Sequence, residues 1–108
     1  MQVKDRLSKA DILNYISTIK PIFLKKGIKI VGLFGSFAKE DDNVYSDIDI
    51  AIQKNKNAFK NGNVYKYFET INEVKSSIQK NLGRNVDIFD IDSASPFVET
   101  IKKELIYV

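Results

Sequence analysis

Apolar residues recur every three or four positions in two long stretches, the spacing that places them on one face of a helix. The first stretch begins at Ser8, and Asp11 three residues later indicates a capping box between the two side chains and the backbone. Gly27 is expected to end this helix, and Pro21 to kink or split it, because proline removes an intrahelical hydrogen bond. The second stretch runs from Val64 to Leu82 and stops at Gly83. The apolar positions are Ile12, Leu13, Ile16, Ile19, Ile22 and Phe23, then Val64, Tyr67, Phe68, Ile71, Val74, Ile78 and Leu82.

Two other segments have the composition and alternation of β-strands. Residues 28–34 are rich in β-branched and aromatic side chains. In residues 46–53 three isoleucines alternate with Asp47, Asp49 and Ala51, so one face of the strand is apolar and the other largely acidic. We expect further strands at 86–91 and 105–108, short helices at 37–39 and about 95–103, and a loop at 54–63.

This order of elements predicts an α/β (α+β) fold, a mixed sheet with its helices mainly on one face. We expect one domain over residues 1–108. A chain of 108 residues has room for one core with one or two helical layers.

Composition removes several kinds of chemistry. The chain has neither cysteine nor histidine, which excludes disulfides, thiolate or imidazole metal sites, and Ser-His-Asp catalysis. Any reaction must therefore use carboxylates, hydroxyls, amines and a bound cation.

Charge and hydropathy bear on partners and location. The formal net charge of +3 comes mostly from lysine and is typical of a solvated surface. Interleaved basic and aromatic residues are missing, which makes nucleic acid an unfavoured partner. The chain has no apolar run of membrane-spanning length and no signal-peptide pattern, so we expect a cytoplasmic protein with no membrane partner.

Asp47 and Asp49 are the first candidates for chemistry. Residues two apart in a strand point the same way, so both carboxylates project from one face. Their repulsion would be relieved by a divalent cation, and oxygen ligands alone favour Mg²⁺ or Mn²⁺. An ordinary strand with exposed aspartates remains the alternative for such a pair taken alone.

Gly35 and Ser36 supply the second half of a candidate site. They follow the apolar strand at 28–34, where glycine allows a tight turn and a close approach of phosphate to the backbone. Ser36 adds a hydroxyl, and the short helix that follows adds free N–H groups. Simple turn chemistry is the alternative reading of the pair taken alone.

A third acid joins this face by strand parity. In residues 86–91, Val86 and Ile88 are expected to face the helices, leaving Asp87 and Phe89 on the other face. Asp87 then shares an open face with Asp47 and Asp49 if the two strands are neighbours. Asp90 and Asp92 are expected to be turn and cap residues.

The segment GSFAKEDDNVYSDID, with LFGSFA before it and a later VDI strand, resembles the Gly-Ser, ten residues, Asp-x-Asp signature of polymerase-beta-like nucleotidyltransferases. The length and the final ELIYV resemble the minimal nucleotidyltransferases, antitoxins often encoded beside a HEPN toxin. The resemblance departs at Glu40, where many members have glycine. An acid there is expected to alter the turn or to disfavour a triphosphate.

The resemblance implies Mg²⁺-dependent transfer of AMP from ATP to a hydroxyl. Asp47 and Asp49 would bind two Mg²⁺ ions (or Mn²⁺), Asp87 would complete the acceptor-side metal and help deprotonate the acceptor, and Gly35 and Ser36 would hold the β- and γ-phosphates. Lys39 would either contact phosphate or remain solvated.

Two functions from different classes stay open. The first is an antitoxin that adenylylates a HEPN-type toxin. The second is a binding module that masks its partner, with catalysis weak or lost. An acceptor protein is expected to dock beside Asp49 and Asp87, with the loop at 54–63 either its rim or a plain connector.

Overall fold

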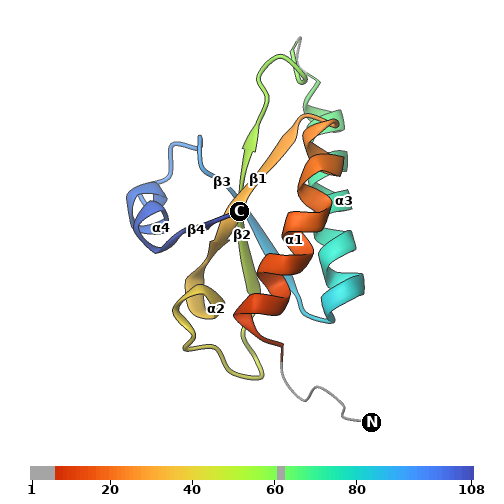
Figure 1. Ribbon diagram of the computed structural model, residues 1–108. Helices are drawn as coiled ribbons and strands as arrows, with labels where there is room; N and C mark the ends of the chain where they lie inside the picture. Colours follow the sequence, from red (N-terminus) through yellow and green to blue (C-terminus); the bar gives the residue numbers. More distant parts are fainter. Residues whose placement is uncertain (1–6, 61–62) are drawn as a thin grey trace.

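The computed structural model describes residues 7–60 and 63–108 (Figure 1). Helices alternate with the four strands along the chain. In order, the elements are α1 (Lys9–Leu24), β1 (Ile28–Phe34), α2 (Gly35–Lys39), β2 (Ile48–Lys54), α3 (Val64–Leu82), β3 (Val86–Asp90), α4 (Val98–Glu104) and β4 (Ile106–Tyr107).

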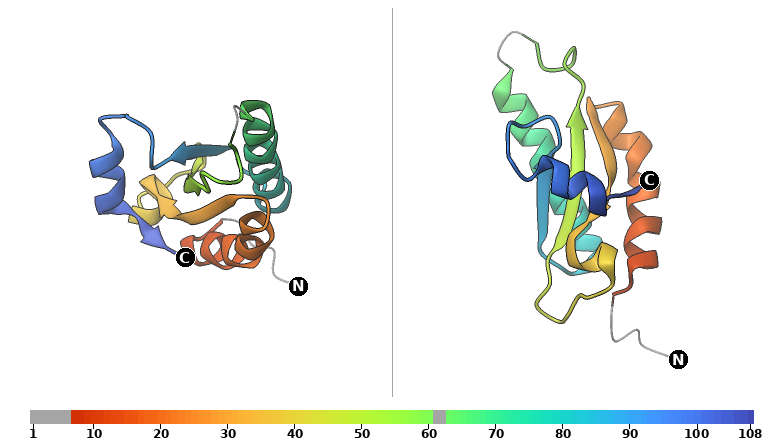
Figure 2. Two further views of the ribbon diagram at one scale, coloured as in Figure 1. Left: turned by 90° about the horizontal axis from the view of Figure 1, so that it is seen from above. Right: turned by 90° about the vertical axis from the view of Figure 1, so that its left-hand side faces the viewer.

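The strands form one mixed sheet in the order β3-β2-β1-β4. β1 pairs antiparallel with both β2 and β4, whereas β2 and β3 run parallel. The two long helices, α1 and α3, cover one face, and α4 lies on the opposite side (Figure 2). The predicted mixed sheet with helices mainly on one face is confirmed.

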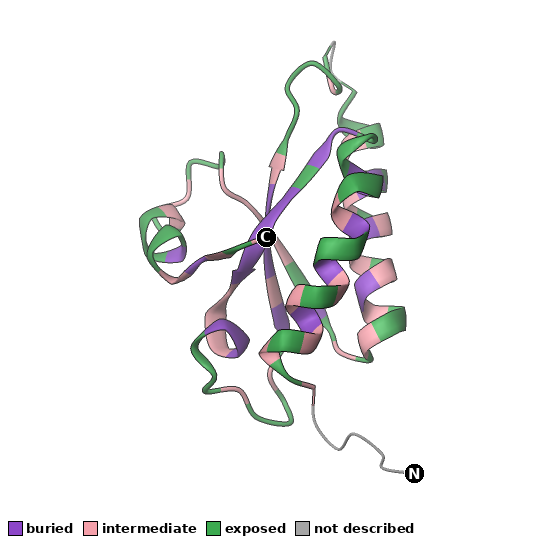
Figure 3. Ribbon diagram, in the orientation of Figure 1, coloured by how far each residue is buried: buried purple, intermediate pink, exposed green. Residues whose placement is uncertain are grey.

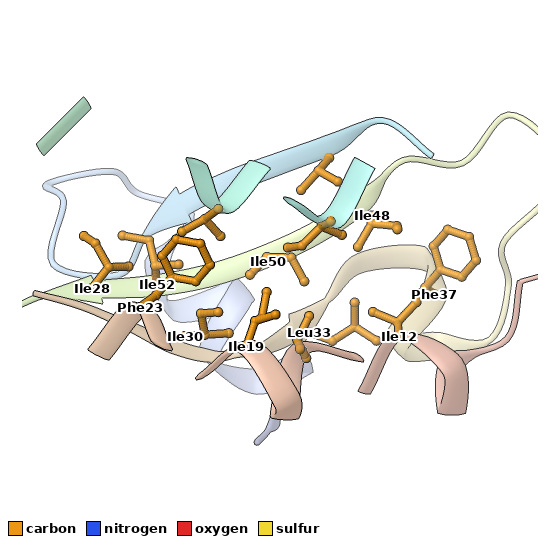
Figure 4. Packing of buried hydrophobic residues seen from close by; sticks show 14 of the residues in the cluster. Ile12, Ile19, Phe23, Ile28, Ile30, Leu33, Phe37, Ile48, Ile50 and Ile52 are labelled. Carbon is orange, nitrogen blue, oxygen red and sulfur yellow. The ribbon is translucent and has the colours of Figure 1, made fainter. Parts of the chain in front are cut away.

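The main core lies between the sheet and the two long helices (Figure 4). Ile48, Ile50 and Ile52 are fully buried there, as their alternation predicts. Replacing one such isoleucine by alanine typically costs about 2–5 kcal/mol, so this face determines how β2 is oriented. Buried positions follow the inner sides of α1 and α3 and run along the strands (Figure 3). The buried members from the helices are Ile12, Ile16, Ile19, Phe23, Phe37, Ala38, Val74 and Ile78.

A smaller apolar cluster lies on the other face of the sheet. Val31, Ala51 and Leu105 are buried there, and Phe34 and Ile91 pack against them. Leu105 directly follows α4, so the C-terminal part of the chain covers a portion of this face. The expectation that the acidic face is left fully open is therefore wrong.

The first helix begins as the sequence predicts and passes through its proline. Ser8 and Asp11 form the expected capping box, with each side chain accepting a hydrogen bond from the other's backbone N–H. The helix is not split at Pro21 and continues to Leu24. Pro21 lies on the exposed side of the last turns, where water can satisfy the carbonyl that proline leaves without a donor.

A β-bulge in β1 changes which face its last residues occupy. Ile30 pairs with Ile52 and Gly32 pairs with Ala51, so Val31 is the extra residue. Before the bulge, Ile28 and Ile30 face the helices; after it, Leu33 does so and Phe34 turns to the opposite face. Bulges commonly redirect a side chain in this way. This one brings the end of β1 onto the acidic face.

The predicted ranges at 28–34 and 64–82 agree with the structure, but α2 begins at Gly35 and not at 37, β2 begins at Ile48 and not at 46, and α4 begins at Val98 and not near 95. The fourth strand is shorter than expected, covering Ile106–Tyr107. No helix in residues 7–60 and 63–108 is both long enough and apolar enough to cross a membrane.

Candidate active site

Asp49 and Asp87 are direct neighbours across two parallel strands. Asp49 is the second residue of β2, and the register pairs it with Asp87, the second residue of β3. Both carboxylates therefore lie on the face opposite the two long helices, Asp49 half-buried and Asp87 exposed. Asp47 precedes β2 by one residue and is exposed. The strands are neighbours, as the sequence argument required, and the register brings Asp49 and Asp87 side by side.

The electrostatics of Asp49 reflect this crowding. The pKa of its carboxyl is raised from 3.8 to about 6, first by burial and then by the negative charges of Asp87, Asp47 and Glu104, in that order of importance. No lysine or arginine in residues 7–60 and 63–108 forms an ion pair with Asp47, Asp49 or Asp87. The site therefore concentrates negative charge that nothing in the described chain neutralises.

The Gly35-Ser36 turn lies directly against Asp49. Gly35 has a φ of 77°, a left-handed conformation that residues with a side chain rarely adopt. A Cβ added to Gly35 would overlap the Oδ2 of Asp49 and lie 3.0 Å from its Cγ. Ser36 follows in the first turn of α2 and is partly exposed. The structure thus brings the two halves of the sequence motif into contact.

Glu40 occupies a position that suits glycine. It is the C-cap of α2 and has a φ of 60° and a ψ of 30°, the left-handed region. Its backbone N–H still donates to the Phe37 carbonyl oxygen over 3.2 Å, so the helix ends as a glycine would allow. The side chain points to Lys9, with which it forms an ion pair of 2.8 Å. The turn is kept in spite of the acid.

The lysine next to the turn is engaged with an acid. Lys39 Nζ lies 3.4 Å from the Oε1 of Glu104, which joins α2 to α4. Lys39 was expected either to contact phosphate or to be solvated. In the structure it is an exposed surface lysine that pairs with Glu104. Glu104 also raises the pKa of Asp49. Sequence reasoning missed Glu104, because only the fold brings α4 to this face.

Arg84 is a second residue that sequence reasoning missed. Its Nη1 donates to the carbonyl oxygens of Ser46, over 2.7 Å, and Asn43, over 3.3 Å. Its guanidinium lies 5.2 Å from the centre of the buried Phe37 ring, within cation–π distance. Arg84 therefore contacts both α2 and the loop that leads to Asp47. The signal in the sequence is one arginine, just before the third strand, in a chain whose cations are mostly lysine.

A pocket of about 440 Å³ adjoins this arginine. Its walls include Asp47, so the approach to the acid is hollowed rather than flat. The lining residues are Val44, Tyr45, Ser46, Asp47, Gln79, Gly83, Arg84 and Asn85.

The three aspartates suit a hard divalent cation by chemistry. They offer only carboxylate oxygens, and a bound cation would offset both the burial and the neighbouring negative charges that raise the pKa of Asp49. Within residues 7–60 and 63–108, no three acidic side chains converge closely enough to enclose a metal by themselves. The donor set therefore fits Mg²⁺ or Mn²⁺ as an open site that needs further oxygen ligands from water or substrate.

Residues 54–60, the described first part of the loop expected at 54–63, lie away from the acids. β2 begins next to Asp49 and ends at Lys54, so the strand carries the loop to the opposite end of the sheet. Five residues of strand span about 17 Å. Of the two alternatives, a rim of the site or a plain connector, the rim is not favoured, because residues 54–60 follow the end of β2 that is distant from Asp49.

Asp90 and Asp92 were expected to be turn and cap residues; Asp92 does lie in a turn, but Asp90 is the last residue of β3, and neither caps a helix, since the N-cap of α4 is Phe97. Asp90 accepts hydrogen bonds from the backbone N–H of Asp92 over 2.8 Å and from the hydroxyl of Tyr67 over 3.1 Å. Asp92 accepts a hydrogen bond of 3.3 Å from the side-chain amide of Gln53. Neither residue joins the three aspartates.

Comparison with known proteins gives consistent results. Residues 17–108 match the family model described as polymerase beta, nucleotidyltransferase. Two proteins of Methanocaldococcus jannaschii, both provisionally named protein adenylyltransferases, are similar in sequence. One is 32% identical over 75% of this chain and 78% of its own length. The other is 34% identical over 78% of this chain and 80% of its own length.

A solved structure has the same fold. It is provisionally described as a minimal nucleotidyltransferase and superimposes with a TM-score of 0.69. The match covers 97% of this chain and 100% of the other, with 19% sequence identity. At that identity the likeness concerns the fold.

Proposed function

The chain belongs to the polymerase beta nucleotidyltransferase family, and from that premise we propose that it transfers AMP from ATP to a hydroxyl of a partner protein. Nucleotidyl transfer is the activity of the family. The nucleotide, the divalent metal and the protein acceptor are parts of the proposal.

The observation that carries the proposal is the contact between Gly35 and Asp49. The Gly-Ser turn, at which we propose that the phosphates bind, lies directly against a carboxylate whose neighbour across the sheet is Asp87. A triphosphate held at the turn would have its reacting phosphorus near both acids. Positioning and charge stabilisation are the main requirements of phosphoryl and nucleotidyl transfer.

Each residue of the site then has a role. Gly35 and Ser36 would hold the β- and γ-phosphates, and Asp47, Asp49 and Asp87 would hold two Mg²⁺ or Mn²⁺ ions. When bound, the ions would offset negative charge on the attacking and leaving oxygens. Asp87 is the most exposed acid on β3 at this edge, so it is suited to take the proton of the acceptor hydroxyl.

The reaction balances without any further reactant. The acceptor oxygen forms a bond to the α-phosphorus of ATP, and the bond from that phosphorus to the bridging oxygen breaks. Pyrophosphate leaves, and the hydroxyl proton passes to Asp87 and then to water. The products are an AMP ester of the acceptor and pyrophosphate.

A protein acceptor is supported by the names of the two archaeal relatives. A HEPN-type toxin encoded beside this protein is our proposed partner, on the strength of the resemblance to minimal nucleotidyltransferases. A tyrosine hydroxyl is the acceptor we propose to examine first.

A second candidate function is a binding module that masks the partner without modifying it. The observation in its favour is that Lys39, the lysine closest in sequence to the turn, is paired with Glu104 and not free for phosphate. A non-catalytic antitoxin would have no need of such a cation.

The test is incubation of the purified protein with labelled ATP, Mg²⁺ and the neighbouring gene product, followed by mass spectrometry of the partner. We expect addition of AMP, and a loss of roughly 100- to 1,000-fold in rate for Asp47→Asn, Asp49→Asn or Asp87→Asn. Asp92→Asn is the matched control, because it removes an acid of the same type outside the site.

Two results would contradict the proposal. Undiminished transfer by the folded Asp49→Asn and Asp87→Asn proteins would make these acids structural. A stable complex that neutralises the partner with no AMP added, and equally with the aspartate variants, would establish the binding module instead.

A further inference from the structure

A short segment far from the aspartates concentrates basic and aromatic residues. Residues 54–68 contain four lysines and four aromatic residues and no acid. The described members, residues 54–60 and 63–68, include the end of β2, the residues directly after it and the first turns of α3. The residues are Lys54, Lys56, Lys60 and Lys66, with Phe59, Tyr65, Tyr67 and Phe68.

The fold gathers several of them around one pocket. The pocket has a volume of about 390 Å³, within the range of small-ligand sites. No described residue that lines it is acidic. The lining residues are Lys54, Lys56, Phe59, Asn63, Val64, Tyr67 and Phe68.

Tyr67 makes one wall of the pocket rigid. Its ring meets Phe59 and Phe68 edge to face, with ring centres 5.4 Å and 5.2 Å apart. Lys54 Nζ lies 5.2 Å from the centre of the same ring, and the hydroxyl donates to Asp90 over 3.1 Å. The aromatic wall is thus fixed by contacts on several sides before any ligand arrives.

Phe68 and Tyr65 remain open to solvent. Phe68 is 57% exposed and Tyr65 is 81% exposed, although both are large aromatic residues. They are three residues apart on α3 and so lie on adjacent parts of its surface. One ring lines the pocket and the other extends the aromatic surface beyond it.

We propose that this surface is a binding site for single-stranded nucleic acid. One base enters the pocket and stacks on Phe68, the phosphates beside it contact Lys54 and Lys56, and a neighbouring base stacks on Tyr65. Aromatic platforms beside cations are the usual means of holding single strands without sequence preference.

The lysines favour nucleic acid over a protein partner. Lysine is depleted in the buried centres of protein–protein interfaces, whereas phosphate backbones attract it. The proposal departs from the expectation that nucleic acid is an unfavoured partner, which rested on missing interleaved basic and aromatic residues. Residues 54–68 do interleave them, and the fold places them together.

The site is separate from the proposed nucleotidyl-transfer site. Lys54 ends β2, and Asp49 lies near its beginning, so the two sites occupy opposite ends of the same strand. Failure of one proposal therefore leaves the other standing.

The test is fluorescence anisotropy of the full chain with a labelled twelve-nucleotide oligouridylate at two salt concentrations. We expect Phe68→Ala to weaken binding roughly 5- to 100-fold, the usual effect of losing one stacked base. Phe68→Leu keeps an apolar side chain but removes the ring on which the base stacks, so it should weaken binding to a similar degree. Phe97→Ala is the matched control, since Phe97 is also exposed, at 66%, but lies at the start of α4.

The phosphate contacts are tested by the salt dependence. Lys56→Ala should reduce the slope of log affinity against log salt by about 0.7, the value for one phosphate contact on a single strand. Lys102→Ala, on α4, should leave the slope unchanged.

Two further ligands distinguish binding of a nucleic-acid strand from binding of a free nucleotide or an acidic protein segment. Free uridine monophosphate and a labelled glutamate-rich peptide are tested with the same variants. The proposal is overturned if the oligonucleotide does not bind, or if the Phe68 variants bind it as tightly as the wild type. It is also overturned if the free nucleotide binds as tightly as the strand, or if the peptide binds with the same dependence on Phe68 and Lys56.

Discussion

Gly35 and Asp49 touch so closely that residue 35 has no room for a side chain. The φ of 77° at Gly35 and the overlap of a Cβ with the Asp49 carboxylate both require glycine. The two residues are the first of the Gly-Ser turn and the second aspartate of the Asp-x-Asp pair. Their contact makes the turn and the acid one structural unit.

Gly35→Ala is therefore expected to damage both stability and transfer. Gly83 provides a matched control, because it has a similar φ of 70° but nothing within 4 Å of an added Cβ. Gly83→Ala should cost about 1–2 kcal/mol, the price of the left-handed conformation alone. Gly35→Ala should cost more and abolish transfer, as measured by urea denaturation and the AMP-transfer assay. Equal costs for both variants would show that the contact with Asp49 has no energetic consequence.

Asp49 should make the free energy of unfolding depend on pH. Its pKa of about 6 in the folded protein lies above the ordinary 3.8, so the folded state keeps a proton that the unfolded state has lost. Stability therefore falls as pH rises from about 4 to about 6. After allowance for solvent screening of a half-exposed carboxyl, the loss is on the order of 1–2 kcal/mol.

Urea denaturation from pH 3.5 to 8, in the presence of a metal chelator, measures how the free energy of unfolding changes with pH. Asp49→Asn should remove that part of the pH dependence and be the more stable protein at pH 8. Asp92→Asn should follow the wild-type curve. Parallel curves for the wild type and Asp49→Asn would exclude a raised pKa at this position.

Ser36→Ala should weaken the binding of ATP. Loss of a hydroxyl that donates to a charged phosphate is worth about 1.5–3 kcal/mol, or roughly 10- to 100-fold in affinity. Calorimetry with ATP and Mg²⁺, repeated with EDTA, measures both the hydroxyl and the metal contribution. Ser93→Ala, in the loop after β3, is the control. Equal affinity with and without Mg²⁺ would remove the metal from the proposed mechanism.

Arg84→Ala should slow transfer more than it weakens ATP binding. The arginine holds the carbonyl oxygens of Asn43 and Ser46, so its loss frees the loop that positions Asp47. Misplacement of a reacting group by about 1 Å can cost up to about 100-fold in rate. We expect kcat to fall about 10- to 100-fold while the affinity for ATP changes little.

Two further variants separate positioning from charge. Arg84→Lys should restore activity only in part, because an ammonium group lacks the fixed fork of the guanidinium. Lys80→Ala, which removes a cation from the last turn of α3, should leave kcat unchanged. A normal kcat in Arg84→Ala would contradict the positioning role.

Glu40→Gly should stabilise the fold relative to Glu40→Ala. Both variants lose the ion pair with Lys9, an exposed contact worth at most about 1 kcal/mol. Only glycine removes the strain of a φ of 60°, which amounts to about 1 kcal/mol. Thermal denaturation of the two variants measures the difference. An alanine variant as stable as the glycine variant would show that the left-handed conformation carries no strain here.

The sequence by itself determined the local features of this protein. The alternation of Ile48, Ile50 and Ile52 with aspartates indicated which face of the strand is buried, because side chains in a strand alternate every residue. The capping box at Ser8 and Asp11 and the spacing of apolar residues in α1 and α3 are equally local. The resemblance carried by the Gly-Ser and Asp-x-Asp segments indicated the family.

Only the tertiary structure decided how these features meet. The extra residue Val31 turns Phe34 and the following Gly35 toward the acidic face, and strand register places Asp87 beside Asp49. The position of α4 brings Glu104 to Asp49, while β2 carries residues 54–60 away from it. These relationships depend on pairing and packing between residues distant in the chain. Periodicity reports which side of an element is buried, whereas the register of neighbouring strands is set by the packing of the whole core.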